Sequence, residues 1–160
     1  MRLFFATVGR MKSGPEKELF ERYCKRIAAS GKSKHLFGPE LIEIAEGNGS
    51  SAQERSSQEA RQLIQKLPDH ARLILLDETG KSRSSKAFAA LIESEQLNGT
   101  EILAFVIGGP DGHGEEIRNL AFDSLQFGSL TWPHQLARVM LSEQVYRAIT
   151  ILAGHPYHRQ

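Results

Sequence analysis

Short apolar runs alternate along this chain with longer segments whose apolar residues recur every three or four positions. Five runs have the length and composition of strands, at residues 3–8, 41–44, 73–76, 102–107 and, more weakly, 124–127. Residues 73–76 and 102–107 are apolar throughout, as strands buried on both faces are. Alternating strands and helices predict an α/β fold with a mostly parallel sheet and helices on both faces.

The segments between these strands carry signals for helix starts. Ser13 and Ser51 each stand three residues before a glutamate, which is the spacing of a capping box. Two further helices are expected at about residues 85–94 and 115–121. The first helix has an apolar face made of Leu19, Phe20, Tyr23 and Ile27.

A last helix is expected at about residues 133–153, and apolar side chains occupy nearly all of its sides. Pro133 suits its first position and Gly154 suits its end. A helix that is apolar all round is buried, and a chain of this length has little structure to cover it. We therefore expect part of it to lie in a homodimer interface. Glu143 and Arg147 interrupt it with i,i+4 spacing, which we interpret as a structural ion pair.

The composition fits a single domain spanning residues 1–160. Cys24 is the only cysteine, which excludes an intrachain disulfide and favours a cytoplasmic location. No apolar run is long enough to cross a membrane without a charge, so no membrane partner is expected. The net charge of +1 is uneven, because residues 1–34 hold nine Lys/Arg and three Glu, a balance of +6. Such a region can bind a polyanion, although charge alone favours a solvated helix face.

Ligands of parallel sheets bind beyond the carboxyl ends of the strands, which points to the loops at residues 77–81, 108–114 and 128–132. Gly108 and Gly109 directly follow a buried strand, where glycine lets a ligand approach the backbone. A tight turn alone would explain them, but a second glycine-bearing loop at a strand end favours a ligand site. Because neither loop carries a cluster of charge, we expect an adenine-bearing ligand of low net charge.

Several other sites are excluded. Residues 79–82 resemble the end of a P-loop, but Leu75 stands where its first glycine must be. No dinucleotide fingerprint follows the first strand, and no G-x-S-x-G elbow exists. His155 and His158 are separated by Pro156 and have no acidic or thiolate ligand at matched spacing, so we expect no metal site.

The residues after the last helix combine a phenol, an imidazole and a guanidinium at Tyr157, His158 and Arg159. Aromatic rings stack on unpaired bases, histidine titrates near neutral pH, and arginine binds phosphate through two hydrogen bonds. A disordered polar end is the alternative. The rigid helix that precedes these residues favours a part of a working site.

Five stretches spread along the chain form a specific set. They are Leu-Asp-Glu at 76–78, Ile-Gly-Gly-Pro-Asp-Gly at 107–112, Leu-Thr-Trp-Pro-His-Gln-Leu-Ala-Arg-Val at 130–139, Glu-Gln-Val-Tyr-Arg-Ala at 143–148 and His-Pro-Tyr-His-Arg at 155–159. Together with the chain length they resemble the RlmH family, bacterial methyltransferases of the SPOUT class.

This resemblance implies a SPOUT-type α/β fold with a C-terminal trefoil knot, an obligate homodimer, and S-adenosyl-L-methionine as the methyl donor. The implied reaction methylates N3 of a pseudouridine in 23S ribosomal RNA of the assembled ribosome. Residues 128–130 depart from the small-polar, lysine-bearing version frequent in the family, so we expect mainly backbone contacts there. The implied cofactor contacts are Leu76, Gly108, Gly109, Phe127, Gly128, Ser129, Leu130, Thr131 and Trp132.

The resemblance also suggests that the terminal residues serve the cofactor pocket of the partner subunit. We hypothesise that His158 assists loss of the N3 proton, Tyr157 orients the base, and Arg159 holds a phosphate or the uracil carbonyl. No metal is needed because the sulfonium methyl is already activated and catalysis is by positioning. Two alternatives stay open: a non-catalytic RNA-binding or ribosome-assembly protein, and a SPOUT methyltransferase acting on transfer RNA.

Overall fold

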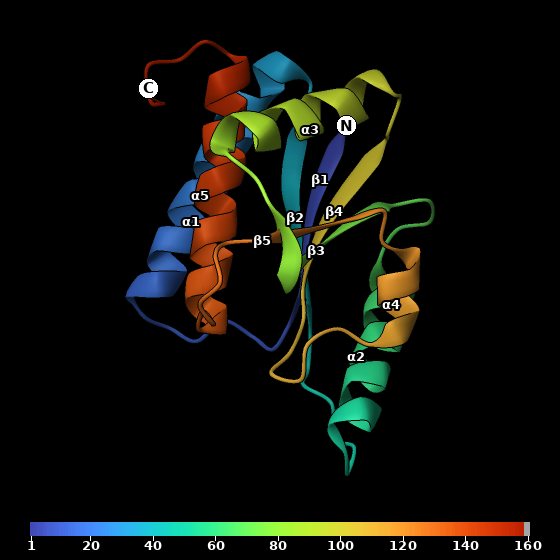
Figure 1. Cartoon of the computed structure of the whole chain (residues 1–160). Helices are drawn as coiled ribbons and strands as arrows, with labels where there is room; N and C mark the ends of the chain where they lie inside the picture. The colour runs from blue at the N-terminus through green and yellow to red at the C-terminus, as the bar shows by residue number, and fades with distance from the viewer. Residues whose placement is uncertain (159–160) are drawn as a thin grey trace.

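The computed structural model describes residues 1–158, which form a five-stranded sheet between two layers of helices (Figure 1). All neighbouring strands are parallel, in the order β2-β1-β4-β3-β5. The predicted α/β class with a parallel sheet is confirmed. The strands are β1 (Arg2–Val8), β2 (Phe37–Ile44), β3 (Arg72–Ser82), β4 (Ile102–Ile107) and β5 (Asp123–Gln126).

Three helices cover one face of the sheet and two cover the other, as Figure 1 shows. On the first face lie α1 (Pro15–Gly31), α3 (Ser85–Leu97) and α5 (His134–Leu152). On the second lie α2 (Ala52–Lys66) and α4 (Glu115–Leu120), and a short 3₁₀ helix, η1 (Lys32–Lys34), follows α1.

The central strands divide their side chains between two cores. In β1, Leu3 and Phe5 point toward α1, α3 and α5, whereas Phe4 and Ala6 point toward α2 and α4. The ring of Phe5 packs edge-on against Phe105 of β4, with centroids 6.0 Å apart. A strand buried on both faces needs apolar residues at consecutive positions, which explains the unbroken apolar runs in the sequence.

The two predicted capping boxes had different outcomes. At Ser51 the N-cap is confirmed, because its hydroxyl accepts a hydrogen bond from the Glu54 N–H at 3.1 Å. The carboxylate of Glu54 reaches back to Ser50 rather than to Ser51, and accepts from the N–H and the hydroxyl of Ser50 at 2.8 Å each. At Ser13 the prediction was wrong: α1 begins at Pro15, its N-cap is Gly14, and no side chain caps it. Pro15 has no N–H and its fixed φ suits the first turn, so the chain enters the helix one residue later than the box requires.

β3 is longer than predicted and contains the segment expected to be a loop. It pairs with β5 through residues 74–76 and pairs with it again at Lys81 and Ser82. Between these contacts Gly80 lies against the backbone of β5, since a Cβ there would be 2.7 Å from the carbonyl carbon of Leu125. The close approach of two backbones explains this glycine. The trefoil knot stays a prediction.

α5 matches its predicted ends closely, with Pro133 as its N-cap. At the other end Gly154 adopts a left-handed φ of 66°, and its N–H donates to the Ile151 carbonyl at 3.0 Å. The His155 N–H donates to the Thr150 carbonyl at 2.9 Å, which completes a Schellman motif. α1 and α3 cover most of this helix within the chain, so covering α5 does not in itself require a partner.

Candidate functional site

A pocket of about 430 Å³ opens at the carboxyl ends of β3, β4 and β5, where the sequence placed its ligand loops. The start of α5 closes one side through His134 and Ala137. This volume suits a ligand of nucleoside size or somewhat larger. Ser129 is not among the lining residues. The other predicted cofactor residues all line the pocket: Leu76, Gly108, Gly109, Phe127, Gly128, Leu130, Thr131 and Trp132.

Two glycines shape the wall of this pocket by letting other groups come close. A Cβ on Gly108 would lie 2.7 Å from the Gly112 carbonyl oxygen and 3.1 Å from His113 Nδ1. A Cβ on Gly109 would lie 2.6 Å from the Glu59 carboxylate. Neither position has room for a side chain, so the loop presents bare backbone to the pocket.

His113 ties this loop to the end of β3. Its Nε2 lies 2.8 Å from the Leu76 carbonyl oxygen, and because a carbonyl only accepts, Nε2 carries the proton. Nδ1 is then a bare acceptor, buried and without a hydrogen-bond partner among residues 1–158. Burial lowers the pKa of His113, against the opposing effects of the Leu76 carbonyl and of Asp77. The ring is therefore neutral near pH 7.

The pocket is more acidic than predicted. Asp77, Glu78 and Asp111 line it together with one guanidinium, that of Arg118. Arg118 lies 2.7 Å from Asp77, whose pKa is raised by burial but more strongly lowered by hydrogen bonds from Thr79 and by Arg118. Of these three carboxylates only Asp111 belongs to one of the two glycine loops, because Asp77 and Glu78 come from β3, and ion pairing compensates part of the charge.

Asp111 and Glu59 flank the glycine loop from the side of α2. Asp111 accepts two hydrogen bonds from Arg55, at 2.7 and 2.9 Å. Glu59 Oε1 accepts from the Gly47 N–H at 2.8 Å, whereas Oε2 has no partner within the described residues. Burial, and next Asp111 with Glu46, raise the pKa of Glu59. The loop thus rests on a carboxyl group that takes up a proton more readily than an exposed glutamate does.

The terminal residues are held against α5 by side chains. The ring of Tyr157 packs on Tyr146 with centroids 4.9 Å apart, and its hydroxyl donates to Glu143 Oε1 at 3.1 Å. The Arg147 Nη1 lies 3.5 Å from His158 Nδ1, and Arg147 Nε donates to Glu143 at 3.0 Å. The predicted Glu143–Arg147 pair is confirmed, and it also anchors the terminal residues.

Burial raises the pKa of the Tyr157 hydroxyl, and its contacts with Tyr23 and Glu143 add to this effect. Tyr157 therefore stays protonated at neutral pH and acts as a hydrogen-bond donor or a stacking ring rather than as a base. The third predicted catalytic residue, Arg159, lies outside the described residues.

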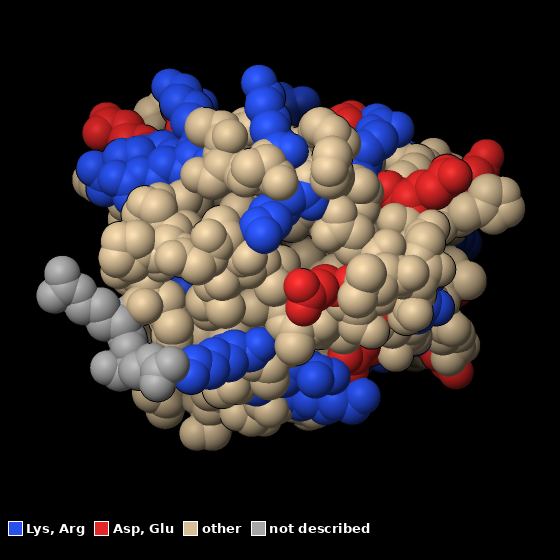
Figure 2. Space-filling view, turned by 90° about the horizontal axis from the view of Figure 1, so that it is seen from above, with Lys and Arg blue, Asp and Glu red and all other residues tan. Residues whose placement is uncertain are grey.

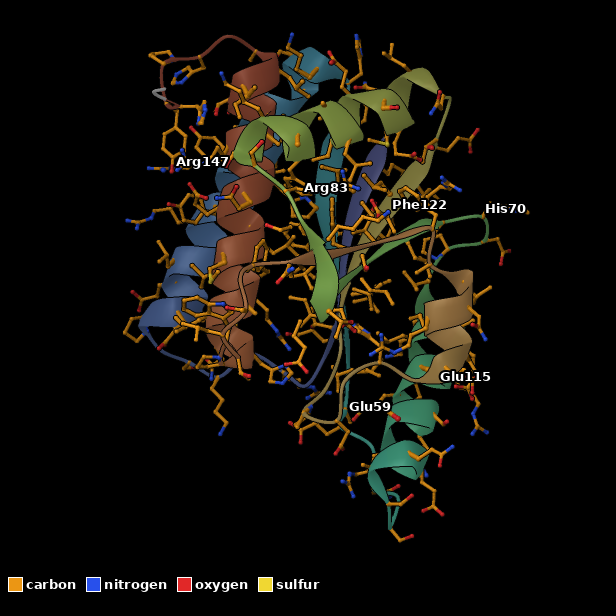
Figure 3. The ribbon with its side chains drawn as sticks, viewed as in Figure 1. Glu59, His70, Arg83, Glu115, Phe122 and Arg147 are labelled. Atoms are coloured by element: carbon orange, nitrogen blue, oxygen red, sulfur yellow. The ribbon has the colours of Figure 1, made fainter. Side chains whose placement is uncertain are left out.

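The pocket and the terminal residues contact different parts of α5. His134 and Ala137 of its first turn line the pocket, whereas the terminal residues follow its last turn. The terminal residues fold back along the helix, however, because Tyr157 and His158 contact Glu143 and Arg147, which lie about 9 and about 15 Å along α5 from Ala137. In Figure 3, Arg147 lies on α5 and Glu59 on α2, on opposite faces of the sheet. The structure brings the predicted cofactor residues together, but it keeps His158 and Tyr157 away from them.

Sequence reasoning missed His113 and Glu59, whose partners are backbone atoms remote in sequence. A signal existed for Glu59, because it shares the core-facing stripe of α2 with Ala60 and Leu63, where a charge is unexpected.

Two further findings concern classes of site. None of the helices within residues 1–158 combines the length and the apolar character needed to span a bilayer. Over the same residues, no cluster of three or more His, Cys, Asp or Glu is arranged to hold a metal ion.

Comparison with known proteins agrees with this geometry. The family model described as "Predicted SPOUT methyltransferase" matches residues 1–158. The chain is 50% identical to "Ribosomal RNA large subunit methyltransferase H" of Mesorhizobium japonicum over 159 residues, which is 99% of each chain. It is 48% identical to the protein of that name from Brucella anthropi over 159 residues, again 99% of each.

Among solved structures, the SpoU methyltransferase AviRb from Streptomyces viridochromogenes is similar at a TM-score of 0.43 and 12% identity, over 96% of this chain and 61% of that one. That likeness is too distant to inform the site. The family model and the close relatives span nearly the whole chain, and the chain therefore belongs to the SPOUT methyltransferase family.

Proposed function

We propose that this chain is an S-adenosylmethionine-dependent methyltransferase of large-subunit ribosomal RNA that modifies N3 of a pseudouridine in the 23S RNA. The observation that carries this proposal is the glycine-walled pocket at the carboxyl ends of β3, β4 and β5, in a chain 50% identical to a relative named as a methyltransferase of large-subunit ribosomal RNA. The cytoplasm, and a single domain over residues 1–160, are the setting and organisation that we expect.

The pocket fits the cofactor in shape and in charge. Gly108 and Gly109 leave backbone amides and carbonyls bare for the edge of an adenine, and Leu76 and Phe127 supply apolar walls. S-Adenosylmethionine carries a sulfonium, an ammonium and one carboxylate, so its net positive charge suits the acidic lining. When bound, it supplies a methyl group that is already activated by the positive sulfur.

The distance along α5 favours a site shared by two chains. Tyr157 and His158 contact Glu143 and Arg147, about 9 and about 15 Å along α5 from Ala137, and neither of them lines the pocket of its own chain. In a homodimer of opposed chains, the terminal residues of one protomer would lie at the pocket of its partner. Leu130, Trp132 and Leu136 at the pocket mouth are exposed in this single chain, and a second copy would cover them.

The terminal residues then supply what the pocket lacks. His158 takes the proton that N3 of the pseudouridine must lose, because an imidazole accepts protons near neutral pH. Tyr157 orients the base, and Arg159 holds a phosphate or the uracil carbonyl. Glu143 and Arg147 keep Tyr157 and His158 in place through the hydrogen bonds described above.

A mixed dimer tests the shared site. Chains with Gly108→Ala, which fills the pocket wall, and chains with His158→Ala are coexpressed with different tags, and the mixed dimer is purified. It holds one intact pocket facing one intact terminus, so it should recover about half of the wild-type turnover on large ribosomal subunits. Each homodimer, whose sites all carry one defect, should be nearly inactive.

A mixed dimer as inactive as the two homodimers would contradict the shared site. Methyl transfer to transfer RNA but not to ribosomal subunits would favour the transfer-RNA methyltransferase instead. Binding of RNA without any binding of S-adenosylmethionine, measured by calorimetry, would favour the non-catalytic assembly protein.

A further inference from the structure

We propose that the surface formed by the C-terminal half of α1 and by η1 binds the phosphates of the RNA that flanks the target base. This basic surface belongs to the protomer that presents His158, not to the one whose pocket holds the cofactor. The inference rests on the proposed function and adds the place where the RNA backbone lies.

The basic surface is a continuous stretch of positive charge. Between Arg22 and Lys34 the chain has no Asp or Glu. Apart from Lys34, which is half-buried, its cations are exposed, and none of them forms an ion pair within residues 1–158. Figure 2 looks onto this end of the molecule, where Lys and Arg cover more of the surface than Asp and Glu. The cations are Arg22, Lys25, Arg26, Lys32 and Lys34.

The helix dipole favours Lys32, the C-cap of α1, and Lys34 in the last turn of η1, but it does not account for Arg22, Lys25 and Arg26. Cations are stabilised by a helix C-terminus only within its last turn. The last turn of α1 carries no basic residue, and Arg22, Lys25 and Arg26 lie before it. These three exposed cations form no ion pair within residues 1–158 and are available to a polyanion, although Glu18 and Glu21 line the same surface hollow.

The basic surface adjoins the terminal residues. The guanidinium of Arg26 lies over the rings of Tyr23 and Tyr146, 5.6 Å from each centroid. Tyr146 in turn packs against Tyr157, and Arg147 lies 4.9 Å from the Tyr157 ring centroid. A nucleotide held at Tyr157 and His158 would therefore have its neighbouring phosphates within reach of α1.

The opposite end of the chain has the opposite charge. Asp77 and Asp111 are paired with Arg118 and Arg55, so the pocket lining carries an excess of one carboxylate, that of Glu78, which suits a cationic cofactor better than a phosphate. A protomer that binds the cofactor thus gains little RNA affinity from its own pocket. The partner's basic surface supplies that affinity at the same shared site.

A pair of double variants tests this assignment. Lys25→Gln with Lys32→Gln removes two charges from the basic surface, and Arg61→Gln with Lys66→Gln removes two exposed charges from α2 on the other face of the sheet. Each phosphate contact contributes a slope of about 0.7–0.9 to the dependence of log affinity on log salt. When salt is raised from about 50 to about 200 mM, the affinity for large ribosomal subunits falls by some factor. Loss of two phosphate contacts should make this factor roughly tenfold smaller.

We expect the Lys25/Lys32 variant to raise the KM for subunits and to flatten the salt dependence of subunit binding, with unchanged affinity for S-adenosylmethionine. The Arg61/Lys66 variant should behave as the wild type. Equal salt slopes for the two variants would overturn the proposal, and so would a loss of cofactor affinity at Lys25/Lys32. Because subunit binding is measured directly, failure of the wild type to transfer methyl would count against the proposed function alone.

Discussion

The two ends of α5 are built on different principles. At its N-terminal end the pocket is made of bare backbone, and glycines there leave no room for a Cβ. At its C-terminal end Tyr157 and His158 are positioned by side chains, through Glu143, Arg147 and Tyr146. The pocket end holds a small ligand by shape, whereas the terminal end offers groups that can move a proton or stack on a base. Substitutions should therefore separate cofactor binding from turnover.

The largest expected effect is at the terminal end. His158→Ala should lower turnover on ribosomal subunits by about 10²–10⁴-fold, which is the usual contribution of a general base. Affinity for S-adenosylmethionine should stay unchanged in calorimetry, because His158 does not line the pocket of its own chain and is proposed to contact the base rather than the cofactor. His70→Asn serves as a control, since His70 is exposed in a turn with a left-handed φ that asparagine tolerates. Unaltered turnover in His158→Ala would remove this residue from the reaction.

The next effect is at the pocket end. Gly108→Ala places a Cβ 2.7 Å from the Gly112 carbonyl oxygen. Overpacking of about 1–3 kcal/mol should weaken binding of S-adenosylmethionine by roughly 10–100-fold. Gly99→Ala is the matched control, because it strains a left-handed φ but meets nothing within 4 Å. Similar losses in the two variants would mean that general destabilisation, rather than the pocket wall, lowers the affinity.

Substitutions of His113 test whether its hydrogen bond to the Leu76 carbonyl shapes the cofactor pocket. Glutamine can place its amide N–H near the position of Nε2 and keep the hydrogen bond to the Leu76 carbonyl, whereas asparagine is too short. His113→Asn should weaken cofactor binding about tenfold, the cost of one lost buried hydrogen bond. His113→Gln should retain most of the affinity, and kcat should change little in either variant. Equal affinities would show that this hydrogen bond does not shape the pocket.

The smallest effect concerns stability and pH. Because the pKa of Glu59 is raised in the folded chain, its contribution to stability is present below the unfolded pKa and is lost as pH rises through the folded value. Glu59→Gln stays neutral and keeps an oxygen for the Gly47 N–H. The free energy of unfolding of the wild type should therefore fall relative to that of the variant as pH rises from about 4 to about 8. Urea unfolding at both pH values measures this, and parallel curves would contradict the assignment.

The sequence predicted the framework well because local rules determine it. Unbroken apolar runs identified β3 and β4, and the glycine after Ala153 gave the end of α5. β2 begins at Phe37, earlier than predicted. Most residues of this edge strand are exposed or half-buried, so its first half lacks the regular apolar pattern by which a strand is recognised in sequence. The start of α1 was misplaced because Pro15, not Ser13, determines where the chain enters the helix.

The site was predicted in part because strand ends and glycines are visible in sequence, whereas long-range partners are not. His113 binds a carbonyl 37 residues away, and Glu59 binds an amide 12 residues away. The ion pair between Asp77 and Arg118 is likewise invisible in the sequence, where each residue looks like an ordinary surface charge. The resemblance to the RlmH family supplied the cofactor and the shared site, which no rule of periodicity provides.

The length of α5 has a consequence for how activity depends on dilution. If the cofactor pocket and the terminal residues that serve one reaction belong to different protomers, a folded monomer is inactive. Below the concentration at which dimers form, the rate per unit volume should grow with the square of the protein concentration. The helix α5, which ends before Gly154, sets this requirement, because the residues that follow it do not line the pocket of their own chain.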